Sequence, residues 1–197
     1  LDGVIGLPIS WASEYDLVTL NLGSGETEGE VPVFVPRDVS EALIESIEDP
    51  SDRIICLVGP YKSGKTRTLI ESLRSSKLTN SKVFWLNPGF DRLAERLMAL
   101  KESELRGSIF IIDDLQRFSY STESGLTPKL VKFLSSLGKI LVTVGEADFL
   151  QWDLDTDFSQ HERNVQSASP SIQLRDLLTR RRFHLGPKFS ESEVARA

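Results

Sequence analysis

The sequence predicts an α/β fold in which a mostly parallel central sheet lies between two layers of helices. Short apolar runs alternate with segments whose apolar residues recur at helical spacing, as in strands joined by helical crossovers. A glycine-rich loop at residues 59–66 follows the first apolar run. Two carboxylates at residues 113–114 follow the third, where a parallel sheet places its ligands. The apolar runs are residues 54–58, 82–86, 108–112 and 139–144.

The composition of the 197-residue chain is that of one globular domain, with 40% apolar and 26% charged residues. No apolar run approaches the roughly 20 residues of a membrane-spanning helix. The formal net charge of −6 argues against a broad nucleic-acid-binding surface. The single cysteine, Cys56, suits a buried thiol in a reducing compartment. We therefore expect a cytoplasmic protein that binds neither membranes nor nucleic acids.

The composition divides the chain into an N-terminal arm with an acidic linker, residues 1–30, and one domain, residues 31–197. Trp11 and Tyr15 are compatible with a short packed arm or strand, whereas residues 23–30 are rich in glycine and glutamate, so we expect poor order there. The chain begins without a methionine or a signal peptide. We expect a piece of a longer protein whose domain is truncated at its C-terminus.

Before the loop, the chain predicts an extended segment and a helix. Residues 31–36 are extended because prolines restrict themselves and the residues before them. Asp38 and Glu41 fit a capping box, which predicts a helix that ends near Asp49. Arg37 precedes this helix, and its local pattern is that of a solvated surface charge.

Residues 59–66 carry the spacing G-x-x-x-x-G-K-[ST], the P-loop or Walker A pattern, between a strand and a helix. Gly59 and Gly64 let the backbone turn so that successive N–H groups converge on phosphate oxygens. Lys65 supplies a positive charge for the β and γ phosphates, and the Thr66 hydroxyl is placed to bind Mg²⁺. An ordinary glycine turn is the disfavoured alternative. The expected nucleotide-binding residues here are Gly59, Pro60, Tyr61, Lys62, Ser63, Gly64, Lys65, Thr66 and Arg67.

The apolar run that ends in Asp113 and Asp114 has the Walker B pattern, a buried parallel strand with acids at its carboxyl end. Asp113 would hold Mg²⁺, directly or through a water molecule, and Asp114 is the candidate for polarising an attacking water. The pattern is weak alone, but about 50 residues after a Walker A loop it becomes a strong signal. Lys65 and Asp114 are therefore the expected catalytic residues.

Thr143 lies near the carboxyl end of the next predicted strand, where a polar side chain senses the γ-phosphate in such folds, although threonine is also simply a good strand former. Residues 145–169 are irregular and acidic. Arg180–Arg182 ends a predicted helix as a solvated charge run or, alternatively, as a cationic lid that reaches phosphate. The predicted helices are residues 38–49, 65–75, 91–105, 127–137 and 170–182, followed by a short strand at 183–187 and a capping box at Ser190 and Glu193.

The order of these elements specifies parallel strands joined by right-handed crossovers, with the ligand at their carboxyl ends. The extra strand between the Walker A and Walker B segments is the arrangement of the ATPase branch of P-loop proteins. No guanine-reading N-K-x-D pattern occurs. We therefore expect a P-loop NTPase three-layer sandwich of the additional-strand branch that binds ATP or ADP with Mg²⁺.

Residues 34–38, 59–66 and 113–118, and the strand with Thr143, resemble the nucleotide-binding domain of STAND-type NTPases, signal-transduction ATPases with numerous domains. The likeness is to bacterial, especially actinobacterial, multidomain forms. It implies a switch in which ATP and ADP states reposition neighbouring effector or repeat domains, with slow or regulated hydrolysis and a nucleotide-dependent oligomer.

The same resemblance places Arg37 near the adenine or its sugar and makes Thr143 the γ-phosphate sensor. The family often has an arginine two residues after that threonine, and this chain has Gly145 there. The expected function is an ATP·Mg²⁺-binding switch domain with weak ATPase activity. Two alternatives stay open: a small-molecule kinase with Arg180–Arg182 as its lid, and an interaction module on the same fold that does not depend on nucleotide.

Overall fold

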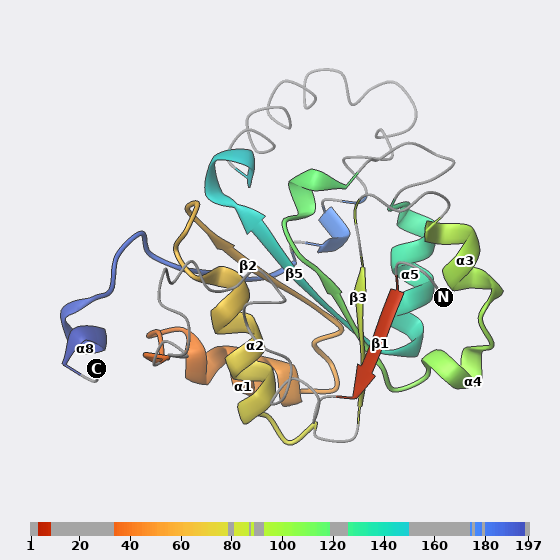
Figure 1. Cartoon of the computed structure of the whole chain (residues 1–197), viewed down its shortest axis with the longest axis horizontal. Coiled ribbons are helices and arrows are strands. Elements are labelled where there is room, and N and C mark those ends of the chain that lie inside the picture. The colour runs from red at the N-terminus through yellow and green to blue at the C-terminus, as the bar shows by residue number, and fades with distance from the viewer. Residues whose placement is uncertain are drawn as a thin grey trace, which may run out of the picture.

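The computed structural model describes residues 4–8, 34–78, 81–86, 88, 93–118, 126–149, 174, 176–178 and 180–195. Their strands form one six-stranded sheet in the order β1-β3-β4-β5-β2-β6 (Figure 1). Strands β2 to β6 pair in parallel, and β1 pairs with β3 in the antiparallel sense. The strands are β1 Val4–Pro8, β2 Ile54–Gly59, β3 Lys82–Leu86, β4 Ile109–Ile112, β5 Lys139–Gly145 and β6 Arg181–His184.

Strand β5 lies between β2, which leads into the glycine-rich loop, and β4, which ends in the two aspartates. This is the strand order of the additional-strand branch of P-loop folds, and it confirms the predicted fold class. All five parallel strands present their carboxyl ends to one edge of the sheet, where such folds bind ligands. The loop and the aspartates consequently meet at that edge.

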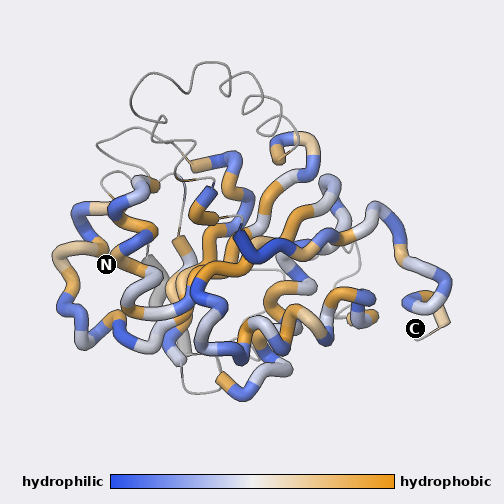
Figure 2. Tube along the Cα trace, turned by 180° about the vertical axis from the view of Figure 1, so that it is seen from behind, coloured by the Kyte–Doolittle hydropathy of each residue, from blue (hydrophilic) through white to orange (hydrophobic). Residues whose placement is uncertain are grey.

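Helices cover both faces of the sheet, which makes the predicted three layers. The residues of β2 alternate: Ile55 and Leu57 join one buried cluster, and Cys56 and Val58 join the other. Successive strand side chains point to opposite faces, so an unbroken apolar strand fills both layers. Figure 2 shows the apolar strands at the centre of the molecule. Helices α1 Ser40–Glu48 and α2 Lys65–Ser75 cover the first face, and α3 Leu93–Ala99, α4 Glu102–Leu105 and α5 Pro128–Leu137 cover the second.

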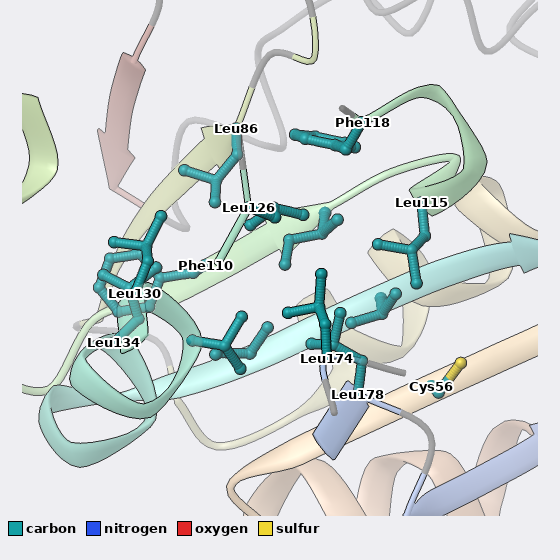
Figure 3. Packing of buried hydrophobic residues seen from close by; sticks show 14 of the residues in the cluster. Cys56, Leu86, Phe110, Leu115, Phe118, Leu126, Leu130, Leu134, Leu174 and Leu178 are labelled. Atoms are coloured by element: carbon teal, nitrogen blue, oxygen red, sulfur yellow. The ribbon is translucent and has the colours of Figure 1, made fainter. Parts of the chain in front are cut away.

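The larger core lies under α5 (Figure 3). Leu130 and Leu134 of this helix pack toward Phe110 of β4, whose ring stacks on that of Phe84 with 5.6 Å between centroids. The helix begins as its sequence predicts, because Thr127 Oγ1 accepts a hydrogen bond from the Leu130 N–H at 3.1 Å and Pro128 occupies the first turn.

Two predicted helices differ from the structure. The helix expected at residues 91–105 is two, α3 and α4, because the chain is extended at Lys101 with φ −67° and ψ 136°. The helix expected to end at Arg182 stops earlier, and Arg181 and Arg182 begin β6. They pair with Ile55 and Cys56, in the middle of β2. The open edge of β2 offers these residues backbone partners that a helix end could not, which explains the error.

The capping box predicted at Asp38 and Glu41 is also wrong. Helix α1 has Val39 at its N-cap, with no side-chain cap. The Asp38 carboxylate instead accepts hydrogen bonds from the hydroxyls of Ser190 and Ser192, at 2.6 and 3.1 Å, which lie 152 and 154 residues away in the sequence. The second capping box is confirmed, because Ser190 and Glu193 cap α8 Glu191–Val194.

The sequence did not single out β1, which extends the sheet beside β3. Trp11, Tyr15, the linker at residues 23–30 and most of the acidic stretch at 145–169 lie outside the described residues. Within the described part of the chain, no helix combines the length and the hydropathy that crossing a bilayer requires.

Candidate functional site

The glycine-rich loop joins β2 to α2, and two of its residues have a positive φ. These are Lys62, with φ 60°, and Gly64, with φ 86°. Gly59 is required for a different reason: a Cβ there would lie 2.9 Å from both the Leu185 carbonyl oxygen and the Ser63 hydroxyl. Such contacts are too short, so the loop can pass this point only as glycine.

Lys65, the first residue of α2, is buried at 7% exposure beneath the loop. Its Nζ donates to the carbonyl oxygen of Pro60 at 2.8 Å. Burial lowers the pKa of Lys65, and the nearby carboxylates, first Asp114 and then Asp113, partly oppose this effect. The ammonium group is therefore held at the loop by its own backbone, in the field of the two aspartates that follow β4.

Two hydroxyl groups from two different elements converge on the Asp113 carboxylate. Its Oδ1 accepts hydrogen bonds from the Thr66 hydroxyl of α2 at 2.8 Å and from the Thr143 hydroxyl of β5 at 2.6 Å. Burial raises the pKa of Asp113, and the hydrogen bonds from Thr143 and then Thr66 act in the opposite direction. The structure thus brings together the side chains that the sequence predicted for the metal site and for the γ-phosphate sensor.

Asp114 turns the chain sharply after β4. It is a non-glycine residue in the left-handed region, with φ 52° and ψ 63°, and its N–H donates to Thr143 Oγ1 at 2.9 Å. Left-handed backbone at a non-glycine residue is uncommon and concentrates at functional sites. Thr143 therefore contacts both aspartates: its hydroxyl donates to Asp113 Oδ1 and accepts from the N–H of Asp114.

The residues present fit a magnesium ion bound together with phosphate. Mg²⁺ in such sites takes one or two protein oxygens and fills its other positions with water and phosphate oxygens. The Thr66 hydroxyl and the Asp113 carboxylate, 2.8 Å apart, are such a pair. Among the described residues, no three His, Cys, Asp or Glu side chains form a group that could hold a metal ion without further ligands.

The other predicted nucleotide-binding residues have different surroundings. Arg37 is 5% exposed, so the expectation of a solvated surface charge is wrong, and its guanidinium contacts protein acceptors. Arg67 pairs along α2 with Glu71, with 3.0 Å between Nε and Oε1. Tyr61 is 86% exposed at the loop, with Lys62 Nζ 5.7 Å from its ring centroid.

Sequence reasoning missed two groups around the site. Glu146 and Asp148 lie close enough to Lys65 to raise its pKa, and an acidic composition was the only signal for them. Asp148 also fills the space beside Gly145, where an added Cβ would lie 2.3 Å from its Oδ2. Glu193 is the ion-pair partner of Arg37 at 2.9 Å. Its role as a helix cap already explained Glu193, so no further signal pointed to that pairing.

The comparisons with known proteins bear on the fold. No protein-family model matches the sequence, and no curated protein matches it either. Among solved structures, the chain is similar to S. cerevisiae Hsp104 in its extended-conformation complex with casein, with a TM-score of 0.50 and 13% sequence identity. The similarity covers 93% of this chain and 30% of the Hsp104 chain. This similarity concerns the fold alone, and it agrees with the P-loop NTPase-like arrangement of the sheet.

Proposed function

We propose that this domain binds ATP and ADP with Mg²⁺ and acts as a nucleotide-dependent switch with slow hydrolysis. The observation that carries the proposal is the convergence of the Thr66 and Thr143 hydroxyls on one carboxylate oxygen of Asp113, beside a complete Walker A loop. Burial raises the pKa of Asp113, so its charged form is disfavoured in the protein without a ligand. A bound cation would offset that cost, and the carboxylate and the two hydroxyls suit a cation-and-phosphate site.

Each residue has one role in this proposal. The loop amides between Gly59 and Lys65 bind phosphate oxygens, and Lys65 exchanges its bond to the Pro60 carbonyl for a phosphate oxygen. Thr66 and Asp113 hold the magnesium ion, which supplies neutralisation of phosphate charge. Asp114 orients the attacking water, and Thr143 responds to the γ-phosphate through its hydroxyl.

Slow turnover follows from Gly145. This residue stands two positions after Thr143, where the STAND resemblance leads one to expect an arginine, and Asp148 occupies the adjacent space. An arginine that contacts the transferring phosphoryl group is worth roughly 10³–10⁵ in turnover rate. A domain without that contact at this position holds ATP long enough to act as a switch, with its effector, repeat or oligomeric partners reading the bound state.

The small-molecule kinase alternative requires a mobile lid, and the fold does not offer the one expected. Its lid was to be Arg180–Arg182, but Arg181 and Arg182 lie in β6, paired with the middle of β2. Backbone bonded into a sheet cannot swing over a substrate as a lid does.

Calorimetric titration of the chain with ATP, ADP and GTP in Mg²⁺, followed by phosphate release from the same samples, tests the proposal. We expect adenine-selective binding and slow release. Replacing Lys65 by alanine removes the positive charge that would contact the phosphates. It should weaken nucleotide binding at least about tenfold, or about 1.4 kcal/mol. The matched control is Lys132→Ala, an exposed lysine on α5, which should leave affinity unchanged. Failure of the wild-type chain to bind any of the three nucleotides would refute the proposal.

A further inference from the structure

Arg37 uses its whole guanidinium to join three parts of the chain. Its Nη1 donates to the Ser63 carbonyl oxygen of the loop at 2.7 Å. Its Nη2 donates to the carbonyl oxygens of Gly186 and Lys188, at 3.0 and 3.1 Å, and its Nε donates to Glu193 Oε1 at 2.9 Å. The planar fork of an arginine suits such a fixed set of acceptors, and a lysine could not satisfy all of them.

Glu193 completes the cluster from the other side. Its carboxylate also accepts from the backbone N–H groups of Asp38 and Ser190, at 2.6 and 2.7 Å. Burial raises the pKa of Glu193, but these backbone bonds and the Arg37 guanidinium outweigh that effect and leave the pKa lowered. The Phe189 ring, 4.6 Å from Arg37 Cζ, covers the guanidinium. Figure 1 shows α8 beside the start of α1, as these contacts require.

The segment at residues 185–195 contacts the loop at a second point. The Leu185 N–H donates to the Val58 carbonyl oxygen at 2.7 Å, and Leu185 packs so closely on Gly59 that no Cβ fits between them. The loop is therefore bounded by this segment at its first residue, through Leu185, and at its fifth, through Arg37. A change in how the segment docks must change the surroundings of the loop at both of these residues.

The bond to Ser63 has a direct consequence for the loop's donors. The Ser63 carbonyl and the Gly64 N–H belong to one planar trans peptide, so they point in opposite directions and cannot rotate independently. By holding the carbonyl, Arg37 fixes the direction of the Gly64 N–H on the other side of the loop backbone. That N–H is one of the donors that a Walker A loop offers to phosphate.

We propose that Arg37 is a positioning residue that couples the orientation of the Ser63–Gly64 peptide to the docking of residues 185–195. The docking of residues 185–195 then depends on the orientation of the Ser63–Gly64 peptide. Coupling between two sites is reciprocal, so a ligand that requires one peptide orientation changes the docking of the segment, and docking changes the affinity for that ligand. The ligand half of this statement rests on the proposed function, and the coupling itself does not.

Amide NMR of the wild-type chain and of Glu193→Gln, both without nucleotide, tests the coupling. Glutamine keeps the size of the side chain but weakens its bond to Arg37. We expect the cross-peaks of Ser63 and Gly64 to shift, although Glu193 is 129 residues from Gly64 in the sequence, while those of β4 stay in place. The matched control is Glu191→Gln, an exposed glutamate on the same short helix, which should leave the loop peaks unmoved. Loop peaks that do not move, or that move equally in the control, would overturn the proposal.

A second arm uses the probe Mg²⁺·ADP. In the wild-type chain, ADP should shift the amide peaks of Ser190 and Glu193, and Arg37→Lys should abolish that response while weakening ADP binding about fivefold or more. ADP binding that leaves these two peaks unmoved would overturn the coupling. A wild-type chain that binds no ADP would refute the proposed function alone, because the nucleotide-free comparison still decides the role of Arg37.

Discussion

Asp113 is a residue whose charge the nucleotide-free fold holds at an energetic cost. Its pKa is raised by burial above the ordinary value of 3.8, despite the hydroxyls of Thr143 and Thr66 that bond to it. The folded state therefore binds the Asp113 proton more tightly than the unfolded state does. Above both pKa values the residue is charged in both states, and the folded state alone carries the cost of burying that charge.

We accordingly predict that Asp113→Asn stabilises the nucleotide-free protein at pH 7 by about 1 kcal/mol, because the uncharged amide does not carry the cost of burying a charge. The asparagine oxygen can still accept from both threonines. The gain should be absent well below pH 3.8, should grow as the pH rises from there to the raised pKa, and should level off above it. Urea unfolding of both proteins across this range measures it. A variant less stable than wild type at pH 7 would show that the charge stabilises the fold.

At the residue scale, the sequence alone predicted which side chains meet at the carboxyl edge of the sheet wherever the signal is local. Lys65, Thr66, Asp113 and Asp114 are named by motifs that span a few residues each, and Thr143 by its place at a strand end. Arg37 is the opposite case. Its acceptors lie 26 and about 150 residues away, so its neighbours in the sequence describe an exposed charge while the fold makes it a buried one.

Lys139 shows how one side chain joins two elements. It begins β5, is 7% exposed, and its Nζ donates to the carbonyl oxygens of Ser46, Asp49 and Asp52. These carbonyls lie at the end of α1 and in the turn that follows it, where the helix dipole is negative and carbonyls lack helical partners. The lysine thus fastens the C-terminus of α1 to the edge of the sheet opposite the loop.

We predict that Lys139→Met destabilises the protein by about 2–3 kcal/mol, because methionine keeps the aliphatic stem but removes the ammonium donor that these buried and partly buried carbonyls share. Thermal or urea unfolding measures the loss. Lys132→Met, an exposed lysine on α5, should cost less than about 0.5 kcal/mol. Equal stability of wild type and Lys139→Met would mean that water replaces the ammonium group at no cost. Nucleotide affinity should stay unchanged, since Lys139 lies at the far end of β5 from Thr143.

Elements with signals inside their own residues were predictable, and those that depend on distant partners were not. Helices α2 and α5 begin and end where the loop, Thr127 and Gly138 indicate. Strand β6 was mistaken in part for a helix end, because Arg181 and Arg182 become a strand only beside the open edge of β2. Strand β1 likewise requires the edge of β3, which no pattern within residues 4–8 reveals.

For the molecule as a whole, the sheet order decides where charges collect. The loop brings one buried ammonium group to the carboxyl edge, while Asp113, Asp114, Glu146 and Asp148 all act on Lys65 from nearby. The chain as a whole also carries a net charge of −6. A nucleotide tri- or diphosphate adds several more negative charges, which a site with this balance would repel. A divalent cation between Asp113 and the phosphates would offset the repulsion between their negative charges.

We therefore predict that nucleotide stabilises the folded protein only together with Mg²⁺. At a free Mg²⁺·ADP concentration of 100 times its Kd, linkage gives about 2.7 kcal/mol, which raises the unfolding midpoint of a domain of this size by about 5–10 °C. ADP with a chelator should give little shift, and Lys65→Ala, which weakens binding at least about tenfold, should reduce the Mg²⁺·ADP shift by about half or more. Asp113→Asn should remove the Mg²⁺ dependence while leaving a small shift from the loop and Lys65. Equal shifts for the wild-type protein with and without Mg²⁺ would remove Thr66 and Asp113 from the proposed metal site, yet would leave the loop as a phosphate site.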